Sequence, residues 1–166
     1  MYHYCNINKV CLYPAPPFLS FQTAPFYNTP TSFDAWWDNA NSYHLTNNAS
    51  LLYDTIPLSR PFSIGGIGGT RLVTHQGYLK CLPFSMNLCY YSLHVTVTLF
   101  SLGYIQRNGG DYHPDPTRRS SHTLIYSSPH LPPIDTSPLN SQNLLPINFS
   151  SLYQAAIKYP HLYYQP

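Results

Sequence analysis

Residues 88–100 read LCYYSLHVTVTLF, the strongest strand pattern in the chain. Leucine, tyrosine, valine, threonine and phenylalanine dominate this stretch, and such residues favour extended backbone. Leu93, Val95 and Val97 fall on one side of such a strand, and the residues between them are polar. This period of two predicts a strand that buries one face.

Weaker strand patterns lie on both sides of this stretch. We expect further strands at 33–38, 51–53, 62–64, 70–82 and 122–127. Pro57 and Pro61 lack the amide hydrogen that a strand ladder uses, so we expect the chain to break between 53 and 62. Many short two-faced strands bury their apolar sides well in a barrel or sandwich. The sequence therefore predicts an all-β domain over residues 31–127, a small closed or partly open antiparallel barrel. Its expected core is Trp36, Leu51, Ile64, Leu72, Leu79, Val95, Leu99, Leu102 and Ile125.

Proline is concentrated near both ends of the chain, which has 17 prolines in 166 residues. Residues 1–30 combine prolines with scattered aromatic residues, and we expect a disordered leader there. Residues 128–166 have the composition of a proline-rich linker. One short helix is expected within it at 149–158, because Phe149, Leu152 and Ala156 share a helical face and Pro160 follows.

Charge is scarce, at 8% of residues with a net charge of +2, and every acidic residue is aspartate. This composition excludes coiled coils and polybasic arms that bind nucleic acid. Apolar runs of the length that a membrane helix needs are absent from the sequence, and no signal peptide is recognisable at residues 1–10. We therefore expect an intracellular, most simply cytoplasmic, protein whose four cysteines are free thiols.

Neither the cysteines nor the eight histidines have the spacing of a metal site, and we expect no metal. The run Ile-Gly-Gly-Ile-Gly-Gly at 64–69 lacks the lysine and hydroxyl residue of a phosphate loop. We therefore expect no nucleotide cofactor. The glycine pairs, Gly65-Gly66 and Gly68-Gly69, instead indicate a bent or flap-forming β-hairpin.

Residues 37–47 read WDNANSYHLTN and place Asp38 directly after an aromatic strand. This segment resembles the D-[ST]-G-A-[ST]-x-H-[LM] segment of copia-type retrotransposon polyproteins, which carry an aspartic-protease-like barrel. The glycine-rich run at 62–69 resembles the hairpin of that family, and residues 98–105, TLFSLGYI, resemble its NLLSLGQL stretch. The three segments occur in the family's order.

The resemblance implies a retropepsin-like lobe in which Asp38 is the catalytic aspartate. Peptide hydrolysis in such enzymes needs two carboxylates that share one proton about a water molecule. Because one lobe supplies one of them, the expected active species is a homodimer acting on a peptide or polyprotein. We further expect Asp38 to be partly buried, with its carboxylate near backbone N–H groups of the following turn.

Three positions depart from the family pattern. The hydroxyl residue after the aspartate is Asn39, the glycine is Ala40, and Asn41 replaces a small alanine, whereas Ser42 retains the second hydroxyl. We therefore expect a degenerate aspartic-endopeptidase-like site that is inactive. The alternatives are a non-enzymatic module that binds other proteins and a functionless relic of a mobile element.

Overall fold

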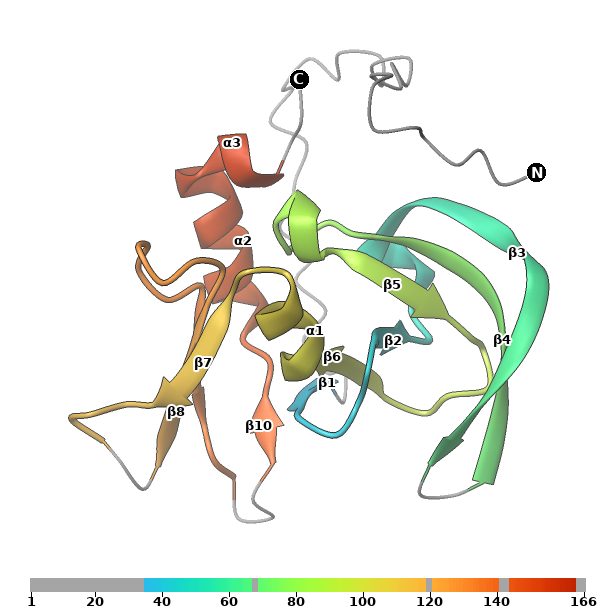
Figure 1. The fold of residues 1–166 in the computed structure, drawn as a ribbon, viewed down its shortest axis with the longest axis horizontal. Coiled ribbons are helices and arrows are strands. Elements are labelled where there is room, and N and C mark those ends of the chain that lie inside the picture. The colour runs from blue at the N-terminus through green and yellow to red at the C-terminus, as the bar shows by residue number, and fades with distance from the viewer. Residues whose placement is uncertain (1–34, 67–68, 119–120, 141–143, 164–166) are drawn as a thin grey trace. The chain divides into compact units, whose positions relative to one another are not determined.

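The computed structural model describes residues 35–66, 69–118, 121–140 and 144–163. The expected leader, 1–30, and the first residues of the expected barrel lie outside these ranges. The described chain is mainly β, with a seven-stranded sheet and a three-stranded sheet (Figure 1). Its helices are short, and no described helix has the length and apolarity that crossing a membrane requires.

The seven-stranded sheet has the order β10-β1-β6-β2-β5-β4-β3. Its strands are β1 (Ala35–Asp38), β2 (His44–Thr46), β3 (Leu52–Gly66), β4 (Gly69–Leu79), β5 (Leu88–Tyr91), β6 (Thr98–Ser101) and β10 (Leu145–Pro146). Strand β1 runs parallel to β6, and β2 runs parallel to β5, whereas the other pairings are antiparallel. The prediction of a mainly β domain is confirmed. The expected closed or partly open antiparallel barrel is not confirmed, because the larger sheet of the described residues is mixed and neither sheet closes.

The prolines at 57 and 61 do not break the chain as predicted. Strand β3 runs through both of them, and the β3–β4 ladder shifts register between Tyr53 and Ile56 and again between Pro57 and Phe62. Strand β3 is the edge of its sheet, where a proline need not donate to a neighbour on the open side. The expected strands at 51–53 and 62–64 are therefore two ends of one long edge strand (Figure 1).

Asp54 lies in the first irregularity of β3 and has a φ of 53°, in the left-handed region. Its side chain is exposed, so its backbone conformation is the property that a substitution tests. We expect Asp54→Val to lower the free energy of unfolding by about 1–2 kcal/mol, since a β-branched residue is strained there. Asp54→Gly, which relieves this strain, should be close to neutral in urea unfolding. Equal stability of the two variants would contradict this reading of the bulge.

The strongest predicted strand, 88–100, is two strands separated by a loop. Strands β5 and β6 occupy its ends, and Ser92 stabilises the turn between them by donating its hydroxyl to the Leu72 carbonyl at 2.6 Å. Val95 is buried in this loop, but Leu93, predicted on the same face, is 75% exposed. The apolar and polar residues therefore alternate in the sequence as described, but residues 88–100 do not form one continuous strand.

The chain after β6 forms the second sheet and the helices. Helix α1 (Leu102–Arg107) leads to β7 (Asp111–Pro114), β8 (His122–Tyr126) and β9 (Asp135–Pro138), which pair in that order. Helix α2 (Phe149–Lys158) has the bounds predicted for it, and α3 (Pro160–Tyr163) follows. Two 3₁₀ turns, η1 (Ala49–Leu51) and η2 (Phe84–Met86), lie earlier in the chain.

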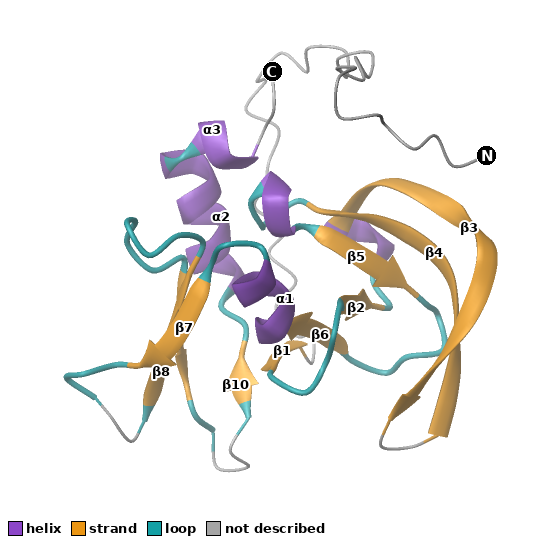
Figure 2. Cartoon of the chain, in the orientation of Figure 1, coloured by secondary structure: helices purple, strands orange, loops and turns teal. Residues whose placement is uncertain are grey.

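The segment expected to be a linker contributes to the main core. Strand β10 pairs with β1, and the side chains of Ile134, Phe149 and Leu152 are buried in the same cluster as those of the larger sheet. Figure 2 shows β10 leading directly into α2. The ordered domain therefore extends to Tyr163 rather than ending near residue 127.

Most of the predicted core is buried. Leu51, Leu79, Val95, Leu102 and Ile125 are buried as predicted, and Trp36, Ile64 and Leu99 are half-buried. Leu72 is 44% exposed, so its prediction is wrong: Val73, its neighbour in β4, takes the inward face. The same shift by one residue applies in β1, where Trp37 is buried to 4% exposure.

Candidate functional site

Asp38 lies at the carboxyl end of β1, opposite Ser101 at the carboxyl end of β6. These strands are parallel, so the segments that follow them leave from the same edge of the sheet. The Asp38 side chain is half-buried, and its Oδ1 accepts a hydrogen bond from the Ala40 backbone N–H at 2.8 Å. The predicted contact between this carboxylate and the following turn is thus present.

The loop after Asp38 is held by the segment after β6. Ser101 donates its hydroxyl to the Asn41 carbonyl at 2.5 Å and accepts the Tyr104 backbone N–H at 2.9 Å, which makes it the N-cap of α1. Arg107, at the end of α1, donates to the Ser42 carbonyl. The two ends of helix α1 therefore hold the backbone of the loop, one at Asn41 and the other at Ser42.

Ser101 was not predicted as a site residue. It lies inside the stretch TLFSLGYI that resembles the family, and a serine that precedes a short helical pattern is a typical N-cap. That local signal could have identified the helix start. Its bond to Asn41 could not have been found from sequence, because the two residues are 60 positions apart.

His44 is completely buried directly beneath this loop. The Ser101 backbone N–H donates to its Nδ1 at 2.8 Å, and its Nε2 is 2.9 Å from the Met86 carbonyl oxygen. Since an amide N–H donates and a carbonyl accepts, the imidazole is neutral with its proton on Nε2. Burial lowers the pKa of His44 to about 3, and the charge of Arg107 also lowers it, whereas the Met86 hydrogen bond opposes the shift. His44 therefore acts as a neutral brace between β2, β6 and η2.

A serine nucleophile does not follow from this arrangement. The Ser101 hydroxyl hydrogen-bonds to the backbone of Asn41 and Tyr104, and it is the Ser101 amide that contacts His44. A Ser/His pair for nucleophilic catalysis needs the hydroxyl on the imidazole. The geometry is that of a loop brace.

The remaining residues of the predicted active-site loop are open to solvent. The side chains of Asn39, Ala40 and Ser42 are exposed. Asp38 alone supplies one carboxylate from this loop. The arrangement can polarise a water molecule if another carboxylate is brought to it.

The predicted glycine-rich hairpin is present as β3 and β4. Gly65 and Gly66 end β3, Gly69 begins β4, and Gly66 pairs with Gly69. Gly68 lies outside the described residues. The two strands form the long curved ribbon in Figure 1, and the Gly66–Gly69 pair is the last in their ladder.

Aromatic side chains connect the Asp38 loop with this hairpin. The ring of Tyr43, 47% exposed, packs edge-on against Tyr90 of β5, with centroids 5.3 Å apart. Tyr90 in turn packs edge-on against Phe62 of β3 at 5.0 Å. We call Tyr43, Tyr90 and Phe62 the aromatic row. Sequence reasoning did not predict it, because its three members come from separate elements.

The two described cysteines are buried free thiols. Burial raises the pKa of Cys81 and of Cys89 well above the usual range of a thiol, so both are chemically inert at neutral pH. Cys5 and Cys11 lie outside the described residues. Within the described ranges, the histidine, cysteine and aspartate side chains form no group of three suited to a metal ion.

Comparisons of the chain with models of protein families, with curated proteins and with solved structures give no match.

Proposed function

We propose that this chain is a degenerate aspartic-protease-like domain of retrotransposon origin that no longer hydrolyses peptide bonds. The observation that carries the proposal is the position of Asp38. Its half-buried carboxylate lies at the end of a strand paired in parallel with another strand, and it accepts the Ala40 N–H of the turn that follows. Such a contact holds a carboxylate at the mouth of a sheet, where it can face a substrate.

The order of elements around Asp38 also supports the proposal. The aspartate loop is followed by a long glycine-tipped hairpin, then by β6 and a helix whose N-cap holds the loop. These are the three segments whose sequences resemble the copia-type family, at 37–47, 62–69 and 98–105. The agreement between the order of these segments in the sequence and their place around Asp38 supports the proposal.

The loss of activity follows from residues 39 and 40. The hydroxyl that would brace two aspartate loops against each other is replaced by the amide of Asn39, which is exposed. Ala40 adds a methyl group where two such loops would approach each other. Both changes oppose the homodimer that would bring two Asp38 carboxylates together, so the chain should not form the shared-proton pair.

Peptide cleavage by the purified chain tests this proposal. We expect no turnover of a peptide library between pH 4 and pH 7, with or without an aspartic-protease inhibitor, and a monomeric elution volume. Turnover that the inhibitor blocks would show that the domain is an active protease and would overturn the proposed loss. Turnover that the inhibitor leaves unchanged would contradict the aspartic-protease assignment itself.

A second candidate function is that of a protein-binding module, and the aromatic row favours it. Tyr43 is exposed and shares its ring contact with Tyr90, so an edge of this row is open to a partner. Tyrosine is common where proteins bind one another, because its ring is rigid and amphipathic. If the chain is such a module, Tyr43→Ala should abolish binding of the partner without changing the fold. A functionless relic would have no partner, so the substitution would have no binding to abolish.

A further inference from the structure

Asp135 is a buried carboxylate outside the site described so far. It opens β9 and is 1% exposed. Its Oδ2 accepts hydrogen bonds from Trp37 Nε1 at 2.8 Å and from the Asn148 backbone N–H at 3.1 Å, and its Oδ1 accepts the Thr136 N–H at 2.8 Å. One side chain therefore joins β9 to β1 and to the start of α2.

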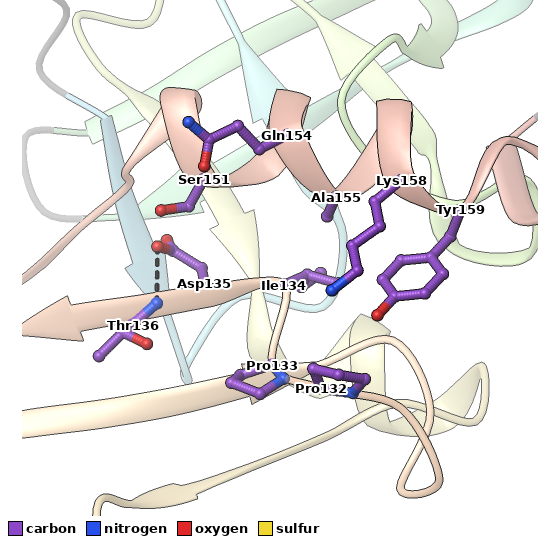
Figure 3. A pocket seen from close by; sticks show the side chains of 10 residues that line it. All are labelled: Pro132, Pro133, Ile134, Asp135, Thr136, Ser151, Gln154, Ala155, Lys158 and Tyr159. Carbon is purple, nitrogen blue, oxygen red and sulfur yellow. Dashed lines mark hydrogen bonds between the residues drawn. The ribbon is translucent and has the colours of Figure 1, made fainter.

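Burying a carboxylate costs free energy unless hydrogen bonds satisfy its oxygen atoms. The three donors are N–H groups rather than a cationic side chain, and an apolar residue would leave the Trp37 indole and the Asn148 amide without this acceptor. Figure 3 shows Asp135 at one end of a pocket of about 210 Å³, with its bond to Thr136 and with Lys158 and Tyr159 at the other end. The Asp135 carboxylate therefore serves as the acceptor of these three hydrogen bonds inside the protein.

The hydrogen bond to Trp37 connects Asp135 with the candidate site, because Trp37 directly precedes Asp38. The Trp37 ring is 4% exposed and packs edge-on against Phe100, with centroids 5.5 Å apart. Trp37 and Phe100 are also register partners, as Asp38 and Ser101 are in the next pair. Phe100 packs in turn against His44, the brace beneath the loop, at 5.3 Å. The orientation of the indole is therefore coupled to the strand end that carries Asp38.

We infer that Asp135 is a positioning residue of the candidate site: it fixes Trp37 and thereby the end of β1, so that the C-terminal segment holds the Asp38 loop in place. The assignment of the Asp38 loop to an aspartic-protease-like site rests on the proposed function, but the contacts of Asp135 do not. The segment from β9 to α2 is then a working part of the site rather than an appendage to it.

The protonation state of Asp135 provides a readout of this coupling. Burial raises the pKa of Asp135 to about 6, against the opposing effect of its three hydrogen bonds. A protonated carboxyl accepts fewer hydrogen bonds, so one of its N–H contacts must weaken below that pH. The ionisable groups around it are Lys158 and Tyr159, which line the same pocket, and the buried Cys81 thiol, whose pKa Asp135 helps to raise.

Nuclear magnetic resonance of the Trp36→Phe chain tests the inference, since Trp37 is then its single tryptophan. We expect the Trp37 indole N–H and the Ala40 backbone N–H to shift together as the pH is lowered, with an apparent pKa near 6. Asp135→Asn in this background should abolish both shifts. The matched control is Asp111→Asn, which removes a half-buried carboxylate that accepts a neighbouring amide N–H, and it should leave both shifts intact.

Two results would overturn the inference. A titrating Trp37 indole with an unaffected Ala40 amide would mean that Asp135 stabilises the fold without positioning the loop. Shifts that persist in Asp135→Asn would assign the titration to another group. If Asp135→Asn does not fold, the paired titration in Trp36→Phe still decides the question, and because no step uses catalysis, an inactive protein leaves the result unchanged.

Discussion

Gly110→Ala should lower the free energy of unfolding by about 3 kcal/mol, at the upper end of the range for overpacked sites. A Cβ added at this position would lie 2.4 Å from the Tyr126 carbonyl oxygen and 2.5 Å from Ile105 Cγ2. Gly110 also donates its amide to the Ile105 carbonyl at 3.0 Å, immediately before β7. The chain leaving α1 cannot move away without breaking this bond, so the strain must appear in stability. Urea unfolding followed by circular dichroism measures it.

Gly65→Ala is the matched control for this prediction. A Cβ at Gly65 would have nothing within 4 Å, so the same chemical change should alter the free energy of unfolding by less than about 1 kcal/mol. If Gly110→Ala is as stable as Gly65→Ala, the close packing of the α1–β7 connection on β8 is wrong.

His44 should make the protein lose stability as the pH falls from 7.5 to 5. Its pKa in the folded state is about 3, below the ordinary value of 6.5, so the unfolded chain binds a proton in this range that the folded chain does not. The loss by pH 5 is about 2 kcal/mol, because each unit of pH below 6.5 contributes about 1.4 kcal/mol. Above pH 6.5 this contribution to stability is fully present.

Protonation of Asp135 changes the free energy of unfolding in the opposite direction, so Asp135 must be replaced before the effect of His44 is measured. Its pKa in the folded state is raised to about 6, so its protonation favours the folded state as the pH falls from 6 to 3.8. We therefore expect the full His44 slope in Asp135→Asn, and its disappearance when His44→Gln is added. His113→Gln, an exposed histidine, is the control that should leave the slope unchanged. A slope that survives His44→Gln would show that another group carries it.

Local patterns predicted those features that depend on neighbours in sequence. Helix α2 has its predicted bounds because the face that includes Phe149 and Leu152 is legible at a period of 3.6 residues and Pro160 lies just beyond its end. The glycine pairs indicated the β3–β4 hairpin. The aspartate after an aromatic strand indicated a turn, and one N–H of that turn, from Ala40, donates to its carboxylate.

The features that were missed depend on partners far away in the chain. Strand β3 tolerates Pro57 and Pro61 because it is an edge strand, and no local pattern says which strand will be at an edge. The choice between Trp36 and Trp37 for the core depends on register with β6, which alternation leaves open by one residue. The proline-rich segment after 127 has the composition of a linker, but Asp135 and Phe149 bind it to β1 and the core.

Placing the residues of the copia-type pattern at positions 39 and 40 tests the proposed function most directly. In the double variant Asn39→Thr with Ala40→Gly, the hydroxyl brace and the space for a second loop return, and we predict dimerisation and inhibitor-sensitive peptide cleavage at acidic pH. Adding Asp38→Asn should abolish this cleavage while the circular dichroism spectrum and the dimer persist. A folded, dimeric double variant without turnover, or turnover that survives Asp38→Asn, would contradict the account of Asp38 as the remnant of an aspartic-protease site.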